Sequence, residues 1–176
     1  MERAVTQIMS VNLNRPCARR RSIRQRGSAL LEGALVLGPF LAMGFAILDY
    51  SLAIFIQNSV RNAAREGVRY AITQQTSGGS QDRAIQNVVI TNSMGFLTST
   101  MLTNNTADIT IQYYDPNSLT LLTGPGSNAG GNVCVVTATI NWTWMAPLWR
   151  NAGLISFSGA SSDVMEAPPN GLLPAR

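Results

Sequence analysis

Residues 26–33 read Arg26-Gly27-Ser28-Ala29-Leu30-Leu31-Glu32-Gly33 and lead directly into an apolar run that ends near Ile56. From Gly33 to Leu48 no residue is charged. A helix needs about 20 apolar residues to cross the hydrocarbon core of a bilayer. A buried core helix in a chain of this length would show a polar face, and this stretch shows none for sixteen residues. Residues 28–56 are therefore predicted to form one transmembrane helix.

Glu32 lies about one turn inside the start of this predicted span. A carboxylate is costly in hydrocarbon, by about 2.5–3.5 kcal/mol at the bilayer centre and by less near the interface. Two interpretations stay open at this point. Either the side chain reaches back to the headgroups, or it pairs with a cation.

The positive charge of the chain is concentrated before the span. Residues 1–27 contain seven of the thirteen arginines and one acid, a net charge of +6, whereas residues 28–176 have a net charge of −2. No aromatic residue lies among the arginines between Arg15 and Arg26, so nucleic-acid binding is not indicated. The positive-inside rule instead predicts a basic cytoplasmic leader at residues 1–27 and places everything beyond the span on the other side of the membrane.

The helical pattern continues past the span. Arg61, Arg65 and Arg69 fall on one face, while small and apolar residues recur on another at three- and four-residue spacing. The members of this second set are Val60, Ala63, Ala64, Gly67, Val68, Ala71 and Ile72. We expect a helical stalk at residues 57–73, so that the helix from Ser28 to Thr73 is about 70 Å long.

Residues 74–167 are predicted to form an α+β head with a small antiparallel sheet. Apolar spacing predicts a second helix from about Ala84 to Phe96, and alternation predicts strands at residues 107–113 and 136–144. Residues 124–131, rich in glycine, are expected to be disordered. Residues 168–176 are expected to be a loose tail.

Three parts of the sequence resemble known secretion components. Residues 27–32 resemble the type IV prepilin processing motif, in which a membrane-embedded prepilin peptidase cuts between Gly27 and Ser28. Residues 62–71, Asn-Ala-Ala-Arg-Glu-Gly-Val-Arg-Tyr-Ala, closely resemble the segment after the membrane helix in TadE-like proteins, pseudopilins of the tight-adherence (Tad, or Flp pilus) system. Residues 142–166 are also similar to the end of TadE-like chains, with a Pro-Leu turn and a small-residue strand.

The resemblance implies a membrane-anchored minor pilin-like subunit that acts in assembly of a Tad/Flp-type pilus. It implies a single-pass protein of the bacterial inner membrane, with a cytoplasmic N-terminus and a periplasmic head. Its expected partners are the membrane, a prepilin peptidase, other pilin or pseudopilin subunits and the Tad inner-membrane assembly platform. Gly33 follows Glu32 where the major Flp pilin typically has an aromatic residue, which favours a minor subunit.

The resemblance also assigns roles to particular residues. Cleavage after Gly27 would create a new amine at Ser28, and this cation would be available to the Glu32 carboxylate of a neighbouring subunit. Arg61, Arg65 and Arg69 are possible assembly contacts. These two groups are the candidate sites of the chain.

Catalysis has little support in the sequence. There is no histidine and no lysine, which removes histidine bases, histidine metal ligands, the P-loop lysine and Schiff-base chemistry. The acids beyond the span are scattered without metal-ligand spacing. Cys17 and Cys134 lie on opposite sides of the predicted span, so they should not form a disulfide. We predict no enzyme activity, no catalytic residue, no metal site and no cofactor.

Two alternatives from other classes stay open. Gly44-Phe45-Ala46 has the small residues that an ordinary signal peptidase needs, which would make the chain a secreted or periplasmic protein. The arginine-rich, acid-poor start is also compatible with an organelle transit peptide ahead of an inner-membrane anchor.

Overall fold

The structure is a computed structural model that describes residues 22–76, 79–145, 151 and 153–176, with side chains from residue 27 onward. The chain divides into two compact units, Met1–Ala42 and Met43–Arg176. The elements are a long helix, two shorter helices and a four-stranded sheet, so the predicted α+β class is confirmed.

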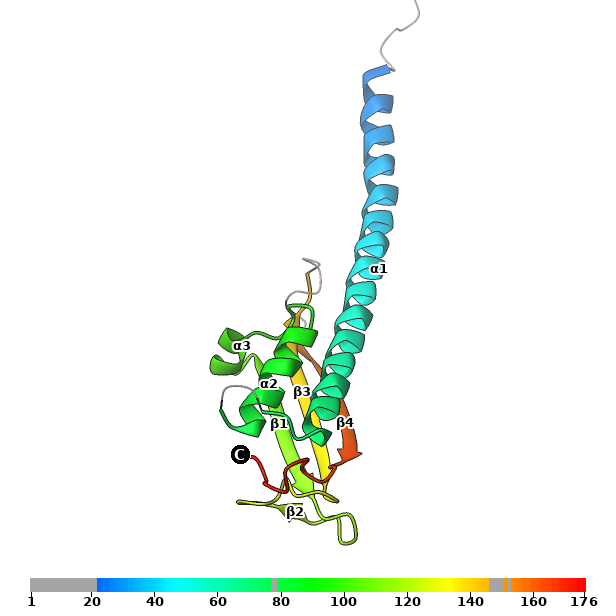
Figure 1. The fold of residues 1–176 in the computed structure, drawn as a ribbon. Coiled ribbons are helices and arrows are strands. Elements are labelled where there is room, and N and C mark those ends of the chain that lie inside the picture. Colours follow the sequence, from blue (N-terminus) through cyan, green and yellow to red (C-terminus); the bar gives the residue numbers. More distant parts are fainter. Residues whose placement is uncertain (1–21, 77–78, 146–150, 152) are drawn as a thin grey trace, which may run out of the picture. The chain divides into compact units, whose positions relative to one another are not determined.

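Helix α1 covers Ser22–Ile72 (Figure 1). It ends one residue before the predicted Thr73 and begins six residues before the predicted Ser28. The helix starts earlier than predicted because residues 22–26 are serine, isoleucine, arginine and glutamine, which a helix tolerates. Gly27 costs only about 1 kcal/mol relative to alanine within a helix. The helix also continues through Pro39, which lacks the N–H for one backbone hydrogen bond.

The first unit contains a long exposed segment of α1 that is mostly apolar. From Gly27 to Leu41 every side chain is exposed within the chain. Gly27–Ile72 is the one helix among the described residues that is long and apolar enough to cross a membrane.

The sheet of the second unit is antiparallel, with the strand order β2-β1-β3-β4. The strands are β1 (Ala107–Tyr114), β2 (Leu121–Leu122), β3 (Val133–Thr143) and β4 (Leu154–Val164). β1 and β3 confirm the predicted strands, and their alternating residues are buried on one face as expected. β2 was not predicted, because two residues are too few to show alternation.

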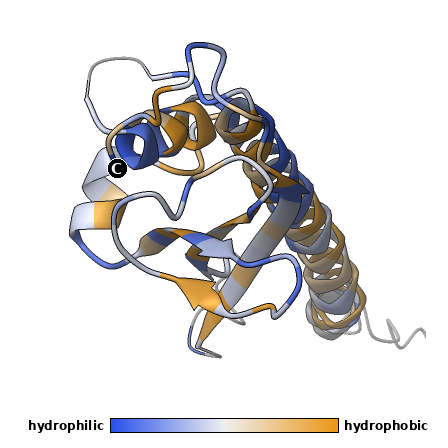
Figure 2. Cartoon of the chain, turned by 60° about the horizontal axis from the view of Figure 1, so that its bottom comes forward, coloured by the Kyte–Doolittle hydropathy of each residue, from blue (hydrophilic) through white to orange (hydrophobic). Residues whose placement is uncertain are grey.

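The second part of α1 and helix α2 (Gln81–Asn92) lie on one face of the sheet (Figure 2). The core combines small residues of α1 with apolar residues of α2 and of the strands. Its largest buried side chains include Tyr113, Ile56, Ile85, Leu97 and Ile140. Ile56 is fully buried, so the far end of the predicted span packs within the head.

Helix α1 also contacts the edge strand β4. The side-chain amide of Gln57 donates a hydrogen bond of 2.8 Å to the backbone carbonyl of Ser158. One residue further, a Cβ on Gly159 would lie 2.7 Å from Cα of Arg61. The helix backbone therefore rests directly on β4 at Gly159.

Helix α2 begins and ends earlier than predicted. Its N-cap residue is Ser80, whose hydroxyl accepts a hydrogen bond from the backbone N–H of Arg83. It stops at Asn92 because Met94 and Gly95 have positive φ angles, 55° and 85°. A short helix α3 (Ser99–Thr103), capped by Thr98, was not predicted.

Two predictions about disorder are wrong. In the glycine-rich segment 124–131, Ser127 and Asn128 are buried and hydrogen-bonded. In residues 168–176, which were predicted to be a loose tail, Arg176 forms a salt bridge of 3.2 Å with Asp82. Buried polar partners far away in sequence fix both segments, and local composition does not reveal such partners. The Pro-Leu turn at residues 147–148 lies outside the described residues.

Candidate functional site

The predicted processing segment lies within α1, in the first unit. Gly27, Ser28 and Glu32 are all helical and exposed. A Cβ on Gly27 would meet nothing within 4 Å, so packing in this chain does not require glycine there. Glu32 makes no ion pair with a residue that the structure describes. A protease that needs an extended backbone would have to unwind the helix at this bond, and glycine lowers that cost by about 1 kcal/mol relative to alanine.

The predicted assembly arginines lie in the second unit, on the solvent side of α1. Arg61, Arg65 and Arg69 are exposed, and none forms a salt bridge with another described side chain. Their four-residue spacing places them along one stripe of the helix. The processing segment and the arginine stripe therefore lie in different units.

The rest of the segment 62–71 serves packing. Ala63, Ala64 and Ala71 are fully buried, and a Cβ on Gly67 would lie only 2.5 Å from Cγ2 of Val89 on α2. Small side chains here let α1 approach α2 and β3 closely. The Asn-Ala-Ala-Arg-Glu-Gly-Val-Arg-Tyr-Ala pattern thus combines a packed face of small residues with an exposed face of arginines.

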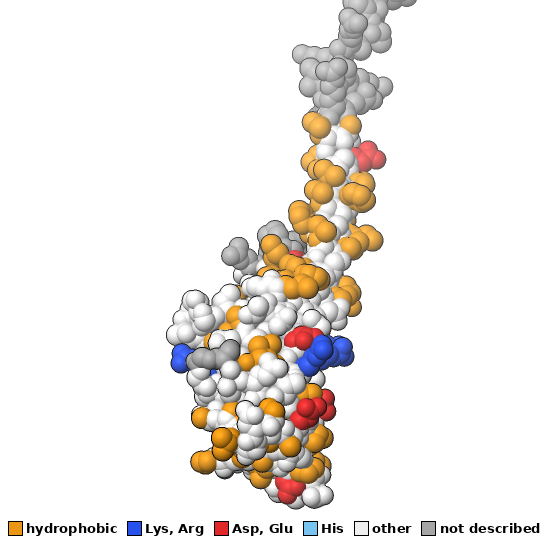
Figure 3. Space-filling model, in the orientation of Figure 1, with side chains coloured by type: hydrophobic (Ala, Val, Ile, Leu, Met, Phe, Trp, Pro, Cys, Tyr) orange, Lys and Arg blue, Asp and Glu red, His pale blue; other side chains and the backbone are white. Residues whose placement is uncertain are grey.

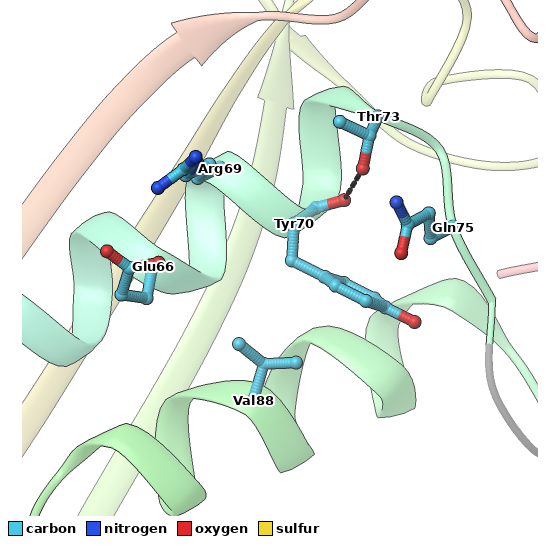
Figure 4. Close-up of a pocket in the computed structure, with 6 residues that line it drawn as sticks. All are labelled: Glu66, Arg69, Tyr70, Thr73, Gln75 and Val88. Carbon is cyan, nitrogen blue, oxygen red and sulfur yellow. Dashed lines mark hydrogen bonds between the residues drawn. The ribbon is translucent and has the colours of Figure 1, made fainter.

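A surface hollow of about 310 Å³ lies beside Arg69 (Figure 4). Arg69, Glu66 and Tyr70 of α1 line it together with Val88 of α2. Thr73 and Gln75 complete its lining. The hydroxyl of Thr73 donates a hydrogen bond of 2.9 Å to the Tyr70 carbonyl, which closes the last turn of α1. Because Arg69 belongs to the arginine stripe, the hollow borders one end of that stripe.

A polar cluster that the sequence did not reveal joins α2, β1 and the C-terminal segment. The hydroxyl of Tyr113 donates a hydrogen bond of 2.9 Å to Asp82, and the Arg176 guanidinium binds the same carboxylate. Arg176 also hydrogen-bonds Ser127. The backbone N–H of Gln81 donates to the Ala175 carbonyl at 2.7 Å. Since these residues lie far apart in sequence, no local pattern indicates the cluster.

Burial raises the pKa of two side chains here, Tyr113 in the cluster and Cys134 beside it. Burial, followed by the nearby Cys134 and Asp82, raises the pKa of Tyr113. Burial, followed by the Asp82 charge, raises the pKa of the Cys134 thiol to about 12. A thiol with that pKa stays protonated at neutral pH and is a poor nucleophile. Among the described residues, no group of three His, Cys, Asp or Glu side chains could hold a metal ion.

These features define an α+β protein whose N-terminal helix carries one apolar segment of membrane-spanning length. The family model described as TadE-like protein matches residues 27–69, about a quarter of the chain, so this segment is similar to TadE-like proteins. The match includes Gly27, Glu32 and all three stripe arginines, and it confirms the resemblance over these residues. TadE-like proteins are a structural rather than a catalytic family. A comparison with curated proteins finds no match, and neither does a comparison with solved structures.

Proposed function

We propose that this chain is a membrane-anchored minor pilin-like subunit that acts in assembly of a Tad/Flp-type pilus. The single observation that carries the proposal is the TadE-like match over residues 27–69, which coincides with an exposed apolar helix. In this proposal the predicted span, residues 28–56, holds the inner-membrane anchor, which ends before Ile56 because that residue packs within the head. The predicted stalk, residues 57–73, packs against residues 74–167 and forms the periplasmic head with them, followed by the segment 168–176.

Processing by a prepilin peptidase is part of the proposal. The leader 1–27, with its net charge of +6, stays in the cytoplasm, and the peptidase cuts between Gly27 and Ser28. The new Ser28 amine then pairs with Glu32 of a neighbouring pilin or pseudopilin subunit. This cation would offset the cost of keeping the carboxylate in hydrocarbon.

The arginine stripe is proposed to contact other assembly components. Arg61, Arg65 and Arg69 are exposed and make no salt bridge within the described chain. Guanidinium groups in a row suit an acidic surface of a partner subunit or of the Tad inner-membrane platform. The chain itself is a substrate of an enzyme and has no catalytic role.

Co-expression with a Tad prepilin peptidase tests the function. Intact-mass measurement of the membrane fraction should give a product that begins at Ser28. A product that begins at Ile47 would support an ordinary signal peptide, and an uncleaved chain would overturn the pilin proposal. A reporter fused after Arg176 should be active only in the periplasm, because the basic leader directs the head outward.

Assembly is tested in cells that make Tad pili, with this chain deleted and then restored. We expect deletion to reduce piliation and the wild-type chain to restore it. As a control, a chain with Arg83→Ala should restore piliation as the wild-type chain does, because Arg83 is an exposed arginine of α2 outside the stripe. A deletion strain that makes normal pili would contradict a role in assembly.

A further inference from the structure

One end of the head, beside residues 50–55 of α1, carries a band of aromatic and apolar side chains that are exposed or, at Trp144, half-buried. We call this band the apolar collar. It consists of Tyr50, Phe55, Met94, Trp144, Met145 and Leu154. Four of these are between 65% and 68% exposed: Tyr50, Met94, Met145 and Leu154. The collar therefore presents large side chains that the head does not cover.

Contacts within the second unit bring the collar together from distant parts of the chain. The Phe96 ring packs edge-on against Phe55 of α1 at 5.7 Å and against Trp142 of β3 at 6.4 Å. Trp144 and Tyr50 line one hollow of about 300 Å³ together with Ala46 and Asp49. Thr143 pairs with Leu154 where β3 meets β4. These contacts fix α1, the segment after α2, and the adjoining ends of β3 and β4 at the same end of the head.

The collar differs from the other end of the head in charge. Residues 50–60, 93–106, 141–145 and 153–162 contain no charged residue. Asp49 lies at the collar's edge but is only 9% exposed. The other end also exposes leucines, Leu119 and Leu121, but it carries Asp82, Asp115, Asp163 and Arg176. Exposure of apolar side chains alone therefore does not distinguish the collar, whereas its lack of charge does.

We propose that the apolar collar lies in the headgroup layer of the bilayer that α1 enters, so that lipid covers it. The inference rests on the proposed membrane anchor. Counted from Ser28, about 20 helical residues cross the hydrocarbon and end near Ile47. The interfacial layer adds about 5–8 Å, or four to five residues. Tyr50 falls within this layer, and Phe55 lies about 5 Å beyond its outer limit, within reach of a long side chain.

The chemistry of the collar selects lipid as its occupant. Tryptophan and tyrosine are enriched at headgroup depth, where an apolar ring and a polar tip are both satisfied. Within the second unit the collar continues into side chains of α1 that are also exposed and apolar, Phe45, Ile47 and Leu48. Figure 3 shows hydrophobic side chains gathered at this end of the head, with most blue and red ones further away. The described collar contains no basic residue, so its binding should not require anionic lipid.

Tryptophan fluorescence of the full chain in vesicles of a neutral phospholipid tests the inference. The variant Trp142→Phe/Trp149→Phe keeps Trp144 as the only emitter. Because interfacial rings sit at headgroup depth, lipids brominated near the top of the acyl chain should remove roughly half of its emission. The control places a tryptophan at the opposite end of the head, by Leu121→Trp in a chain with all three tryptophans replaced by phenylalanine. This emitter should not be quenched by the same lipids.

A third emitter separates this inference from the membrane anchor itself. Phe45→Trp in the tryptophan-free chain reports on the span and should be quenched by lipids brominated deep in the acyl chain. Quenching at position 45 with none at Trp144 would overturn the collar inference and leave the anchor intact. No quenching at either position would overturn both. Shielding of Trp144 from lipid and from aqueous quenchers alike would indicate a second protein on the collar and would also overturn the inference.

Matched charge variants complete the test. Leu154→Asp places a carboxylate on the collar, and Leu121→Asp places one on an exposed strand residue at the other end. Only Leu154→Asp should reduce the quenching of Trp144. Equal quenching in Leu154→Asp and in the unaltered chain, with both folded by circular dichroism, would contradict lipid contact. Replacing a third of the lipid with an anionic lipid should change nothing.

Discussion

The guanidinium of Arg176 lies 4.5 Å from the centre of the Tyr113 ring, and the same group binds the Asp82 carboxylate that accepts the Tyr113 hydrogen bond. The three side chains come from the C-terminal segment, β1 and α2. Arg176 therefore holds the C-terminal segment against the head through a cation–π contact and an ion pair at once.

Removal of this contact should lower the stability of the head. We expect Arg176→Ala to reduce the free energy of unfolding by about 1 kcal/mol, since a partly desolvated cation–π contact and an ion pair are lost. Urea denaturation of the full chain in detergent micelles, followed by tryptophan emission, measures the change. Arg83→Ala is the control, because Arg83 is exposed and its side chain makes no hydrogen bond or salt bridge with a described residue. Equal stability of the two variants would contradict the role of Arg176.

Glycines at two close approaches of α1 should be sensitive to a single added methyl group. Gly67→Ala places a Cβ 2.5 Å from Cγ2 of the Val89 side chain, and Gly159→Ala places one 2.7 Å from the backbone of Arg61. Overpacking costs about 1–3 kcal/mol. Gly159→Ala should cost more than Gly67→Ala, because backbone cannot move aside as a side chain can. The control is Gly44→Ala, whose added Cβ meets nothing within 4 Å and should not lower the melting temperature of the head. A larger loss of stability in Gly67→Ala than in Gly159→Ala would contradict the packing account.

High pH should destabilise the head through Cys134. Burial raises the pKa of this thiol from 9.0 to about 12. The folded state therefore keeps its proton while the unfolded state loses it, so this contribution is complete below pH 9 and is lost as pH rises toward 12. Melting temperature should fall between pH 9 and pH 11, and less steeply in Cys134→Ala. Asp115→Asn is the control. Hydrogen bonds, chiefly the one from the Asn117 N–H, lower the pKa of the Asp115 carboxyl, so this group does not titrate between pH 9 and pH 11.

Bulk at the proposed cleavage bond should block processing. Gly27→Leu should stay uncleaved by the prepilin peptidase, because the side chain is large and the variant favours helix over the extended backbone a protease binds. Gly27→Ala should be processed poorly for the same reasons. Gly33→Leu is the matched control, since a Cβ at either position meets nothing within 4 Å. Intact mass distinguishes the products, and equal cleavage of Gly27→Leu and Gly33→Leu would place the processing site elsewhere.

Neutralising Glu32 should separate anchoring from assembly. Glu32→Gln should insert into the membrane normally, because an uncharged residue is easier to bury. It should crosslink less to partner subunits and support fewer pili, because the Ser28 amine then has only a neutral acceptor. Glu66→Gln, which removes a carboxylate from α1 within the head, is the control. A Glu32→Gln chain that crosslinks and piliates like wild type would show that Glu32 only reaches the headgroups.

The spacing of apolar residues in the sequence was sufficient to predict the helices and strands that have long, regular patterns. The α1 pattern predicted the end of the helix to within one residue, and alternation at Ala107, Ile109 and Tyr113 predicted the buried face of β1. These features follow from side-chain burial along a single element. The motif at residues 62–71 likewise indicated both the packed face and the arginine stripe.

The remaining features depend on contacts between distant segments. Asn128 is buried because its side chain donates to Gln81 and to the Pro174 carbonyl, so a glycine-rich composition predicted disorder wrongly. Arg176 is held by Asp82 and Tyr113, which no pattern near the C-terminal segment reveals. The apolar collar was missed for the same reason, because its residues come from four separate parts of the chain, namely 50–55, 94, 144–145 and 154.

The hydrogen bond from Gln57 to the Ser158 carbonyl also affects how readily the head can aggregate through the edge of its sheet. β4 is an 11-residue strand at the edge of the sheet, and it carries neither proline nor lysine, two residues that commonly prevent strands of other molecules from adding to such an edge. Gln57 occupies the carbonyl of Ser158 on this strand, and the backbone of α1 crosses the strand at Gly159. Helix α1 thus also protects the sheet against cross-β aggregation, and proteolysis that removed Gln57 and Arg61 from the head would remove that protection.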